Sequence, residues 1–534
     1  MTRFSMKRTI ILFSALCLLG FSFELFAQSN PADTLVAFNI KKEATDNSKV
    51  MDLLNMLTNI IGPRLTNSKG MASANAWSQK TLESYGLKAQ VEPWGEFGRG
   101  WDVKSFRAGI TAPYAFQLIA YPKAWSPATR GLIKGKIVYV NEKNLADAKT
   151  KYAGKLKNAI VLIGDEIKVE PDFEAAAKRV SDAELLTMAN AADENGAESW
   201  RVQFRKSPRY AAYVERLKIF SWINEQQPAL ILDGGTSSSR MRSRNSGIVT
   251  VQSASTPLVD ENDVFSRKNP KPYEVNAPVI APQVVVEAEQ FNQIVELIKN
   301  GKDVTMECEL QVDWQSKDTK AYNTIAEWEG TDLKDEVVMI GAHMDSWQSG
   351  TGATDNAAGV SVMMEAVRIL KQLDIKPRRT IRVGLWSAEE EGLLGSRHYV
   401  ENHLKDSLSA KPGYEKFDVY YNLDNGGGQI RGIHIQGNDK VGNTFRQWLE
   451  PFRSWNASTI SLQKTGSTDH ISFDEAGLPG FQFIQDPMEY FTKTWHTNMD
   501  MPDHIIAQDM QRNAAIIAYF VYQSAMRDER IPRK

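Results

Sequence analysis

The sequence has 534 residues, of which 42% are hydrophobic and 24% are charged, and its formal net charge is −2. A chain of this length exceeds what one hydrophobic core usually serves, so we expect two domains. The composition is that of a globular protein. No basic stripe or tail is present, so we expect no nucleic-acid partner.

The first 27 residues differ from the rest of the chain. Basic residues open the sequence, an apolar run extends from Ile10 to Phe23, and Ala27 precedes a polar stretch. This pattern predicts a secretory signal peptide over residues 1–27 and a secreted or periplasmic protein. The alternative is an N-terminal membrane anchor, but the run is shorter than the roughly 20 residues that a membrane-spanning helix needs.

The two cysteines, Cys17 and Cys308, limit the covalent options. A lipoprotein attached through Cys17 is disfavoured, because Leu16 stands where a small residue is expected. Removal of the signal peptide would leave one cysteine and therefore no internal disulfide. No later stretch is long and apolar enough to span a membrane, so we expect no membrane contact after signal removal.

Residues 28–114 are expected to form the N-terminal part of an α/β domain. Apolar residues recur at helical spacing from about Ser48 to Ser84, with a break at Gly62-Pro63-Arg64, and Leu87–Trp94 alternates like a strand.

Residues 115–278 predict an inserted β-rich module. Short strands are expected at 135–140, 158–164 and 229–233. Between them, residues 170–226 are charged and helical in character, which indicates an excursion from the module. Residues 253–278 are rich in Ser, Pro and Asn and are expected to form the linker back from the inserted module.

Residues 279–534 alternate between strand and helix patterns. Alternation of this kind predicts a mainly parallel, mixed α/β sheet covered by helices. The expected strands are 324–328, 336–342, 380–386, 417–423 and 480–484, and the expected helices are 287–299, 356–373, 392–403, 443–450 and 512–527.

Metal-ligand residue types follow several of these strands. His343 comes directly after strand 336–342, the pair Glu389-Glu390 follows strand 380–386, and Asp424 follows strand 417–423. Asp355 is expected to cap the next helix, and Asp345 to orient the His343 imidazole. Ligands of open α/β sheets gather at the carboxyl ends of the strands, so these side chains should meet.

With His496, the set supplies two imidazoles and carboxylates enough for two divalent metals, with Asp355 able to bridge them. One of Glu389 and Glu390 can bind metal while the other stays free as a base. Each residue alone has an ordinary reading, such as a solvated Glu-Glu pair or a helix-capping Asp, but their joint position at one rim favours a metal centre. Imidazole and carboxylate ligands in a hydrolase favour zinc.

The other histidines have less specific settings. His398 and His403 are expected on a helix surface, His434 on a strand face and His504 in a polar turn. His470 could orient a ligand or line the substrate pocket.

Four blocks carry a resemblance to a known family. They are Gly341-Ala-His-Met-Asp-Ser346, Gly352-Ala-Thr-Asp-Asn-Ala-Ala-Gly359, Ser387-Ala-Glu-Glu-Glu-Gly392 and Trp495-His-Thr-Asn-Met-Asp500. In order and spacing they resemble the di-zinc exopeptidases of family M28, in the branch of secreted aminopeptidases and plasma glutamate carboxypeptidase. The inserted module resembles a protease-associated domain, although its helical excursion is larger than such a domain requires.

The resemblance implies a zinc exopeptidase fold and roles for the site residues. Asp355 would bridge two Zn²⁺ ions, His496 would supply the second imidazole, and Glu389 would be the general base for a metal-activated water. Glu390 and Asp424 would complete the two sites, and which of them accompanies His343 stays open. The family often has a cis peptide where Asp355-Asn356 stands here. Tyr490 is a further candidate, as a hydroxyl donor to the reaction's oxyanion.

We therefore expect an exported two-zinc metallopeptidase that removes N-terminal residues from peptide substrates. Glu391 or Asp486 could hold the substrate ammonium. A carboxypeptidase or dipeptidase is the alternative, with Arg431 or Lys493 holding a carboxylate. A binding protein without catalysis is disfavoured because every ligand position is intact. A single-zinc acyltransferase or cyclase is disfavoured by the complete bridging set.

Overall fold

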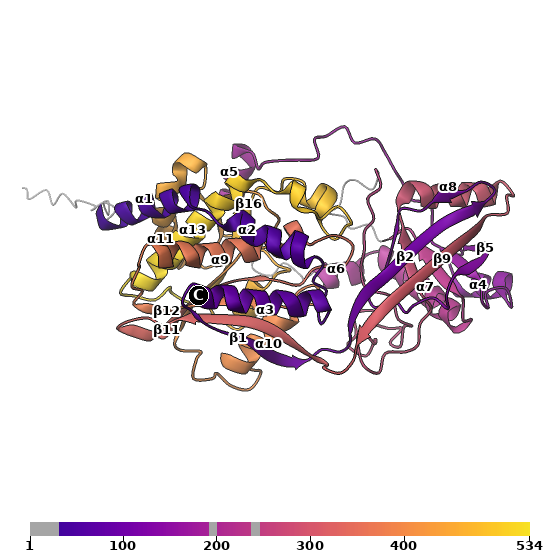
Figure 1. Ribbon diagram of the computed structural model, residues 1–534, viewed down its shortest axis with the longest axis horizontal. Coiled ribbons are helices and arrows are strands. Elements are labelled where there is room, and N and C mark those ends of the chain that lie inside the picture. The colour runs from indigo at the N-terminus through magenta and orange to yellow at the C-terminus, as the bar shows by residue number, and fades with distance from the viewer. Residues whose placement is uncertain (1–30, 192–199, 236–245) are drawn as a thin grey trace, which may run out of the picture.

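A computed structural model describes residues 31–191, 200–235 and 246–534, which form two domains side by side (Figure 1). The signal peptide predicted at 1–27 lies outside the described residues. Among the described residues, none of the helices combines the length and the hydrophobicity that crossing a bilayer requires.

The first domain is built on an eight-stranded mixed sheet in the order β1-β10-β12-β11-β13-β16-β14-β15. Strands β12, β11, β13 and β16 are parallel neighbours at its centre. Residues 337–343 of β11 are all buried, as expected of a central strand covered on both faces. The strands are β1 Lys88–Glu96, β10 Lys320–Trp328, β11 Leu333–His343, β12 Arg379–Trp386, β13 Phe417–Asn422, β14 Ile430–His434, β15 Thr459–Ser461 and β16 Gly480–Gln485.

Helices cover both faces of this sheet. The main hydrophobic core lies between one face and six helices, which are α1 Pro31–Asp46, α2 Val50–Asn55, α3 Lys69–Ser84, α9 Ala358–Gln372, α11 Gly442–Leu449 and α13 Ala507–Met526. A smaller aromatic cluster lies on the other face under α10 Leu394–His403 and α12 His470–Glu475. Shorter helical turns are η1 Met56–Ile61, η2 Ala353–Ala357, η3 Asp439–Val441, η4 Glu450–Trp455, η5 Tyr490–Thr494 and η6 Pro502–His504. The predicted α/β fold with a helix-covered mixed sheet is confirmed.

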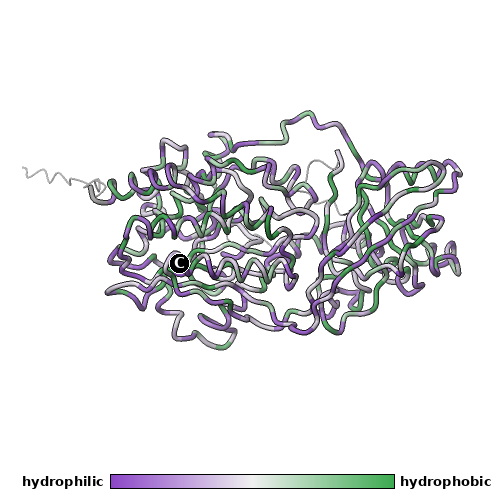
Figure 2. Tube along the Cα trace, viewed as in Figure 1, coloured by the Kyte–Doolittle hydropathy of each residue, from purple (hydrophilic) through white to green (hydrophobic). Residues whose placement is uncertain are grey.

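The second domain contains its own eight-stranded sheet, in the order β3-β2-β9-β5-β6-β7-β8-β4. Its strands are β2 Gly100–Ala112, β3 Phe116–Gln117, β4 Ala120–Pro122, β5 Ile133–Val140, β6 Ile160–Ile163, β7 Leu230–Asp233, β8 Gln283–Val286 and β9 Thr305–Gln315. Helix α8 (Ala288–Lys299) packs against one buried cluster, and α4 (Leu145–Tyr152) and α7 (Arg209–Glu225) pack against another. Hydrophobic residues occur throughout both domains rather than in one of them (Figure 2).

The second sheet extends beyond the boundaries predicted for the insert, 115 and 278. The long strands β2 and β9 pair along their whole length and run side by side in Figure 1, and β8 pairs with β7. The sequence pattern showed strands in this region, but alternation alone does not reveal which sheet a strand joins, because pairing partners are distant in sequence.

The helical excursion predicted at 170–226 divides between the two domains. Helix α7 packs in the second domain, whereas α5 (Asp182–Asn190) lies on the first, reached by an extended segment (Figure 1). The residues before α5 form what we call the 176–181 strap. In it, Lys178 exchanges two backbone hydrogen bonds with Met488, at 3.0 and 2.8 Å. The short α6 (Trp200–Lys206) precedes α7.

Candidate metal centre

Three neighbouring strands bring the predicted ligands to one rim of the first sheet. Strand β11 ends at His343, which is in register with Trp386 at the end of β12. Asp424 follows the end of β13, the neighbour of β11 on its other side. Because these strands are parallel, their carboxyl ends open onto the same crevice. Glu389 and Glu390 follow the end of β12 at this same rim.

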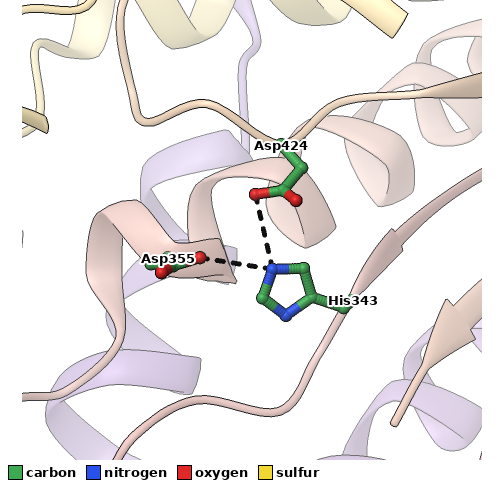
Figure 3. Close-up of side chains that lie close together, drawn as sticks. All are labelled: His343, Asp355 and Asp424. Atoms are coloured by element: carbon green, nitrogen blue, oxygen red, sulfur yellow. Dashed lines mark ion pairs between the residues drawn. The ribbon is translucent and has the colours of Figure 1, made fainter. Parts of the chain in front are cut away.

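The first group of side chains surrounds the His343 imidazole. Its Nε2 lies 3.2 Å from Oδ1 of Asp355 and 3.4 Å from Oδ1 of Asp424 (Figure 3). All three side chains are buried. One imidazole nitrogen and two carboxylate oxygens therefore converge on a point where a small cation fits.

The second group surrounds His496, and Asp355 belongs to it as well. His496 Nε2 lies 3.3 Å from Oδ2 of Asp355 and 3.0 Å from Oε2 of Glu390. The two oxygens of Asp355 thus face different imidazoles, as the predicted bridging role requires. The structure also resolves the pairing that the sequence left open: Asp424 accompanies His343, and Glu390 accompanies His496.

Several polar atoms at this point have no hydrogen-bond partner although they are buried. They are His343 Nε2, Asp355 Oδ2, Glu390 Oε1 and Asp424 Oδ1. Buried polar atoms are normally satisfied, and buried charges are paired or bind metals. Each of the four atoms belongs to one of the groups described above. The donor set therefore fits two divalent cations bridged by Asp355.

Asp355 owes its position to a kinked turn rather than to helix capping. It lies in η2 with non-helical backbone angles and is joined to Asn356 by a cis peptide bond. The prediction that Asp355 caps the helix is wrong: the side chain of Asn356 does so, accepting a hydrogen bond from Gly359 N–H at 3.0 Å. A Cβ at Gly359 would lie 2.3 Å from the Leu423 carbonyl oxygen, so glycine permits the approach that brings Asp355 and Asp424 together.

Glu389 and Asp345 lie beside the His343 group. The Asp345 carboxylate accepts hydrogen bonds from the backbone N–H groups of Glu389 and Glu390 at 3.3 and 3.2 Å. His343 Nδ1 is 3.1 Å from the Asp345 carbonyl oxygen and 3.6 Å from its carboxylate. Asp345 therefore fixes the imidazole chiefly through its backbone. Burial and the nearby carboxylates of Asp424 and Asp469 raise the pKa of Glu389 well above its usual range.

Arg64 organises the loop after β11 and was not predicted. It is fully buried, and its guanidinium donates hydrogen bonds to the carbonyl oxygens of Met344, Leu57, Gly62, Thr351 and Gly352. Burial lowers the pKa of Arg64 to about 10, so it remains charged at neutral pH. The Gly62-Pro63-Arg64 break in the helical pattern was the available signal, but nothing in the sequence showed where the side chain points.

Two more residues that sequence reasoning missed touch the ligands directly. Trp347 donates its indole N–H to Oε2 of Glu390 at 2.8 Å. Asp500 accepts hydrogen bonds from the Thr354 N–H at 2.6 Å and the Asp355 N–H at 3.1 Å. Asp500 ends the last motif block and Trp347 directly follows the first, so proximity in sequence was a usable signal. Both residues also line a small cavity at the centre, with Gly350, Gly352, Asp355, Glu390, His496 and Thr497.

Tyr490 and His470 occupy different settings. Tyr490 is buried in η5, and a Cβ at Gly426 would lie 3.1 Å from the Cβ of Tyr490 and 3.2 Å from its ring. Burial, with Asp355 and Asp424 nearby, raises the pKa of its hydroxyl well above the usual range. His470 is buried at the start of α12, with Nε2 3.1 Å from the Thr465 carbonyl oxygen, and burial lowers its pKa to about 3. The preceding residue, Asp469, is the one close to Glu389.

The candidates for holding a substrate terminus are not equally available. Asp486 accepts hydrogen bonds from Arg179, from the Val180 N–H and from Arg431, so the strap occupies both Asp486 and Arg431. Lys493 pairs with Glu489 at 2.5 Å. Glu391 accepts a hydrogen bond from the Thr66 hydroxyl at 2.8 Å, and its other carboxylate oxygen is buried without a partner.

The remaining histidines lie away from the centre. His398 stacks on Trp94 with ring centroids 4.9 Å apart, and His403 pairs with Glu92. His504 pairs with Glu489. Burial lowers the pKa of His434, at the end of β14, to about 4.

Comparison with curated proteins shows similarity to a carboxypeptidase and to an aminopeptidase. The chain is 29% identical to carboxypeptidase Q of Mus musculus over 261 residues, which cover 49% of this chain and 53% of that protein. It is 33% identical to aminopeptidase YwaD of Bacillus subtilis over 201 residues, which cover 36% of this chain and 42% of that protein. The chain thus spans about half the length of the curated relatives it matches.

Among solved structures, the chain resembles a peptidase M28 precursor from Shewanella amazonensis with a TM-score of 0.63 and 25% identity, covering 94% of this chain and 99% of that one. It also shares the fold of a zinc aminopeptidase from Bacillus subtilis, with a TM-score of 0.54 and 18% identity, covering 90% and 95% of the two chains. Residues 323–521 match the model of peptidase family M28. This region, which carries all five predicted metal ligands, is thus similar to peptidase family M28.

Proposed function

We propose that the protein is a two-zinc exopeptidase that hydrolyses the N-terminal peptide bond of peptides. The observation that carries this proposal is the position of Asp355, whose two carboxylate oxygens face His343 and His496 separately. His343, Asp355 and Asp424 would hold one ion, and Asp355, Glu390 and His496 the other. Imidazole and carboxylate donors in a hydrolase suit zinc, and a solved structure of the same fold is a zinc aminopeptidase.

Two bound zinc ions would lower the pKa of a water molecule and stabilise negative charge on the scissile carbonyl oxygen. The chain's own part in the reaction is proton transfer. Glu389 lies next to the ligand Glu390 and is not needed in either group. A carboxylate in this position suits a general base that accepts a proton from water and returns it to the leaving amine.

Positioning of this base relies on Asp345 and Trp347. Asp345 holds the backbone N–H groups of Glu389 and Glu390 side by side, so that one carboxylate can bind metal while the other remains free. Trp347 keeps the Glu390 carboxylate turned toward His496. We propose Tyr490, which lies near Asp355 and Asp424, as a hydroxyl donor to the carbonyl oxygen as charge develops there.

The surroundings favour a substrate ammonium over a substrate carboxylate. Besides the ligands, the carboxyl groups of Asp345, Glu389, Glu391, Asp469 and Asp500 are close enough to perturb one another or the ligands. Arg431 is occupied by Asp486, and Lys493 by Glu489. The free oxygen of Glu391 makes that residue our candidate for the ammonium.

Carboxypeptidase activity is the second candidate, because the chain matches carboxypeptidase Q over about half the length of that relative. We also propose that the second domain is a protease-associated domain and that the protein is exported, as residues 1–27 indicate.

The test is hydrolysis of free and terminally blocked dipeptides by the full chain, with and without a chelator, beside Glu389→Gln. We expect cleavage that needs a free amino terminus, stops on zinc removal and falls by at least about 100-fold in the variant. Glu401→Gln, which changes an exposed glutamate on α10, is the matched control. A requirement for a free carboxyl terminus would assign the carboxypeptidase activity instead, and full activity in Glu389→Gln would disprove the base.

A further inference from the structure

The second imidazole ligand lies on a backbone that needs external support. His496 has a φ of 56°, in the left-handed region that non-glycine residues adopt only when their surroundings hold them there. It belongs to a turn of the first domain that we call the 496–500 loop. The far end of this loop is fixed by Asp500, which binds the backbone of Thr354 and Asp355.

The near end of the loop is held by the second domain. The Val251 N–H donates a hydrogen bond to the His496 carbonyl oxygen at 3.0 Å, and the Asn498 N–H donates to the Val249 carbonyl oxygen at 3.1 Å. Thr250 and Thr497 face each other in an isolated antiparallel bridge. A short two-stranded contact therefore joins the ligand loop to residues 247–251, which we call the 247–251 segment.

The Asn498 side chain doubles this contact. Its Oδ1 accepts a hydrogen bond from the Val249 N–H at 2.7 Å, and its Nδ2 donates to the Gly247 carbonyl oxygen at 3.1 Å. With the two backbone bonds, four hydrogen bonds connect the loop to the segment. The side chain reaches across the domain boundary while its own backbone lies two residues from the ligand.

The 247–251 segment is itself anchored in the second domain. Val249 and Val251 are buried and pack with Val285 of β8. Just beyond the segment, Ala124 donates to the Gln252 carbonyl oxygen at 3.1 Å and accepts from the Ala254 N–H at 2.8 Å. The contact with the His496 loop is thus an extension of the second domain's own core.

The two metal groups differ in this respect. His343 and Asp355 are hydrogen-bonded to Asp345 and Asp500 within the first domain, and Asp424 follows β13 of the same domain. We propose that the second domain is a structural part of the His496–Glu390 zinc site, and that Asn498 is the positioning residue that connects them. The proposal rests on the two-zinc function above. It adds that the two sites depend unequally on the second domain.

The experiment measures zinc stoichiometry and affinity, by metal analysis and chelator competition, in the full chain and in Asn498→Ala. We expect two zinc ions in the wild type. In the variant one ion should stay tightly bound and the other should bind about 10- to 100-fold more weakly, the usual effect of losing a group that orients a ligand. Activity lost in the variant should return at high zinc concentration, which a general loss of folding would not allow.

Asn292→Ala is the matched control. Asn292 exchanges the same kind of paired hydrogen bonds with Ile167, both at 2.8 Å, but entirely within the second domain. We expect this control to bind both zinc ions as the wild type does. Equal affinity for both ions in Asn498→Ala, or an equal loss in Asn292→Ala, would overturn the inference while leaving the two-zinc function intact. Fewer than two zinc ions in the wild type would contradict the proposed function itself.

Hydrogen exchange in the wild type provides a second test that needs no variant. Because coupling between two sites is reciprocal, zinc binding should slow amide exchange at Val249 and Val251. The Ile167 amide, bonded to Asn292, should not respond. Unchanged exchange in the 247–251 segment on zinc loading would contradict the proposal even if Asn498→Ala failed to fold.

Discussion

The Asp500 carboxylate accepts a hydrogen bond from the backbone N–H of Asp355 at 3.1 Å, and so holds the bridging residue from behind. Asp500 also accepts hydrogen bonds from the backbone and hydroxyl of Thr354, at 2.6 and 2.7 Å. The position of one buried carboxylate therefore bears on both metal groups, because Asp355 belongs to both.

Asp500→Asn should weaken both zinc ions, in contrast to Asn498→Ala. An amide offers one acceptor oxygen, so its NH₂ group would face a backbone donor at Thr354 or Asp355. We expect zinc affinity at both sites to fall about 10- to 100-fold in chelator competition. Asp503→Asn, which changes an exposed carboxylate in η6, should have no effect. Selective loss of a single ion in Asp500→Asn would contradict this prediction.

Trp347→Phe should lower activity without unfolding the protein. Phenylalanine retains an aromatic ring beside Trp125, whose ring centroid is 6.4 Å away, but removes the hydrogen bond to Glu390. A hydrogen bond to a charged group contributes about 1.5 kcal/mol or more, which corresponds to a fall in kcat/KM of about tenfold or more. Trp101→Phe removes a buried indole that donates to the Ser126 carbonyl oxygen instead. If both variants lose activity equally, Trp347 has no specific role at Glu390.

Gly359→Ala should displace the helix start that joins the two metal groups. The added Cβ would lie 2.3 Å from the Leu423 carbonyl oxygen and 2.4 Å from Asn356 Oδ1. Overpacking of this kind costs about 1–3 kcal/mol of unfolding free energy. We expect a lower Tm and weaker zinc binding at the His343 group. Gly466→Ala, where a Cβ would meet nothing within 4 Å, should match the wild type.

Zinc binding should release protons and tighten as pH rises. Burial lowers the pKa of His496, but Glu390 and Asp355 attract the imidazolium more strongly and raise it from 6.5 to about 10 in the metal-free protein. Zinc needs the neutral imidazole, so binding below pH 10 displaces this proton. The zinc Kd should therefore fall by up to about tenfold per pH unit from this group alone.

Calorimetry in buffers of different ionisation enthalpy would count the protons released, and a Kd independent of pH would contradict the prediction. The stability that the His496 charge contributes to the metal-free protein changes with pH in the opposite direction to the zinc affinity. Because the folded pKa of His496 lies above 6.5, its charge stabilises the metal-free protein fully below that pH, and the effect disappears as pH rises through about 10.

The sequence by itself predicted which residues meet at the candidate centre. Metal-ligand residue types at the ends of successive buried strands must meet at one rim, because parallel strands end on the same side of a sheet. That argument brought His343, Asp355, Glu390, Asp424 and His496 together, and the structure assembles these residues in two groups. The strand and helix periods of the first domain were equally readable, since each depends on local side-chain spacing.

Only the tertiary structure decided how the ligands are shared and what supports them. Whether Asp424 or Glu390 accompanies His343 depends on strand order, which the sequence pattern does not encode. Three features depend on contacts between residues far apart in sequence. They are the hydrogen bonds of the Arg64 side chain, those by which the 176–181 strap occupies Asp486 and Arg431, and those that join the second domain to the 496–500 loop. Such contacts produce no periodic pattern in the local sequence, because the partners are far apart in the chain and meet only when it folds.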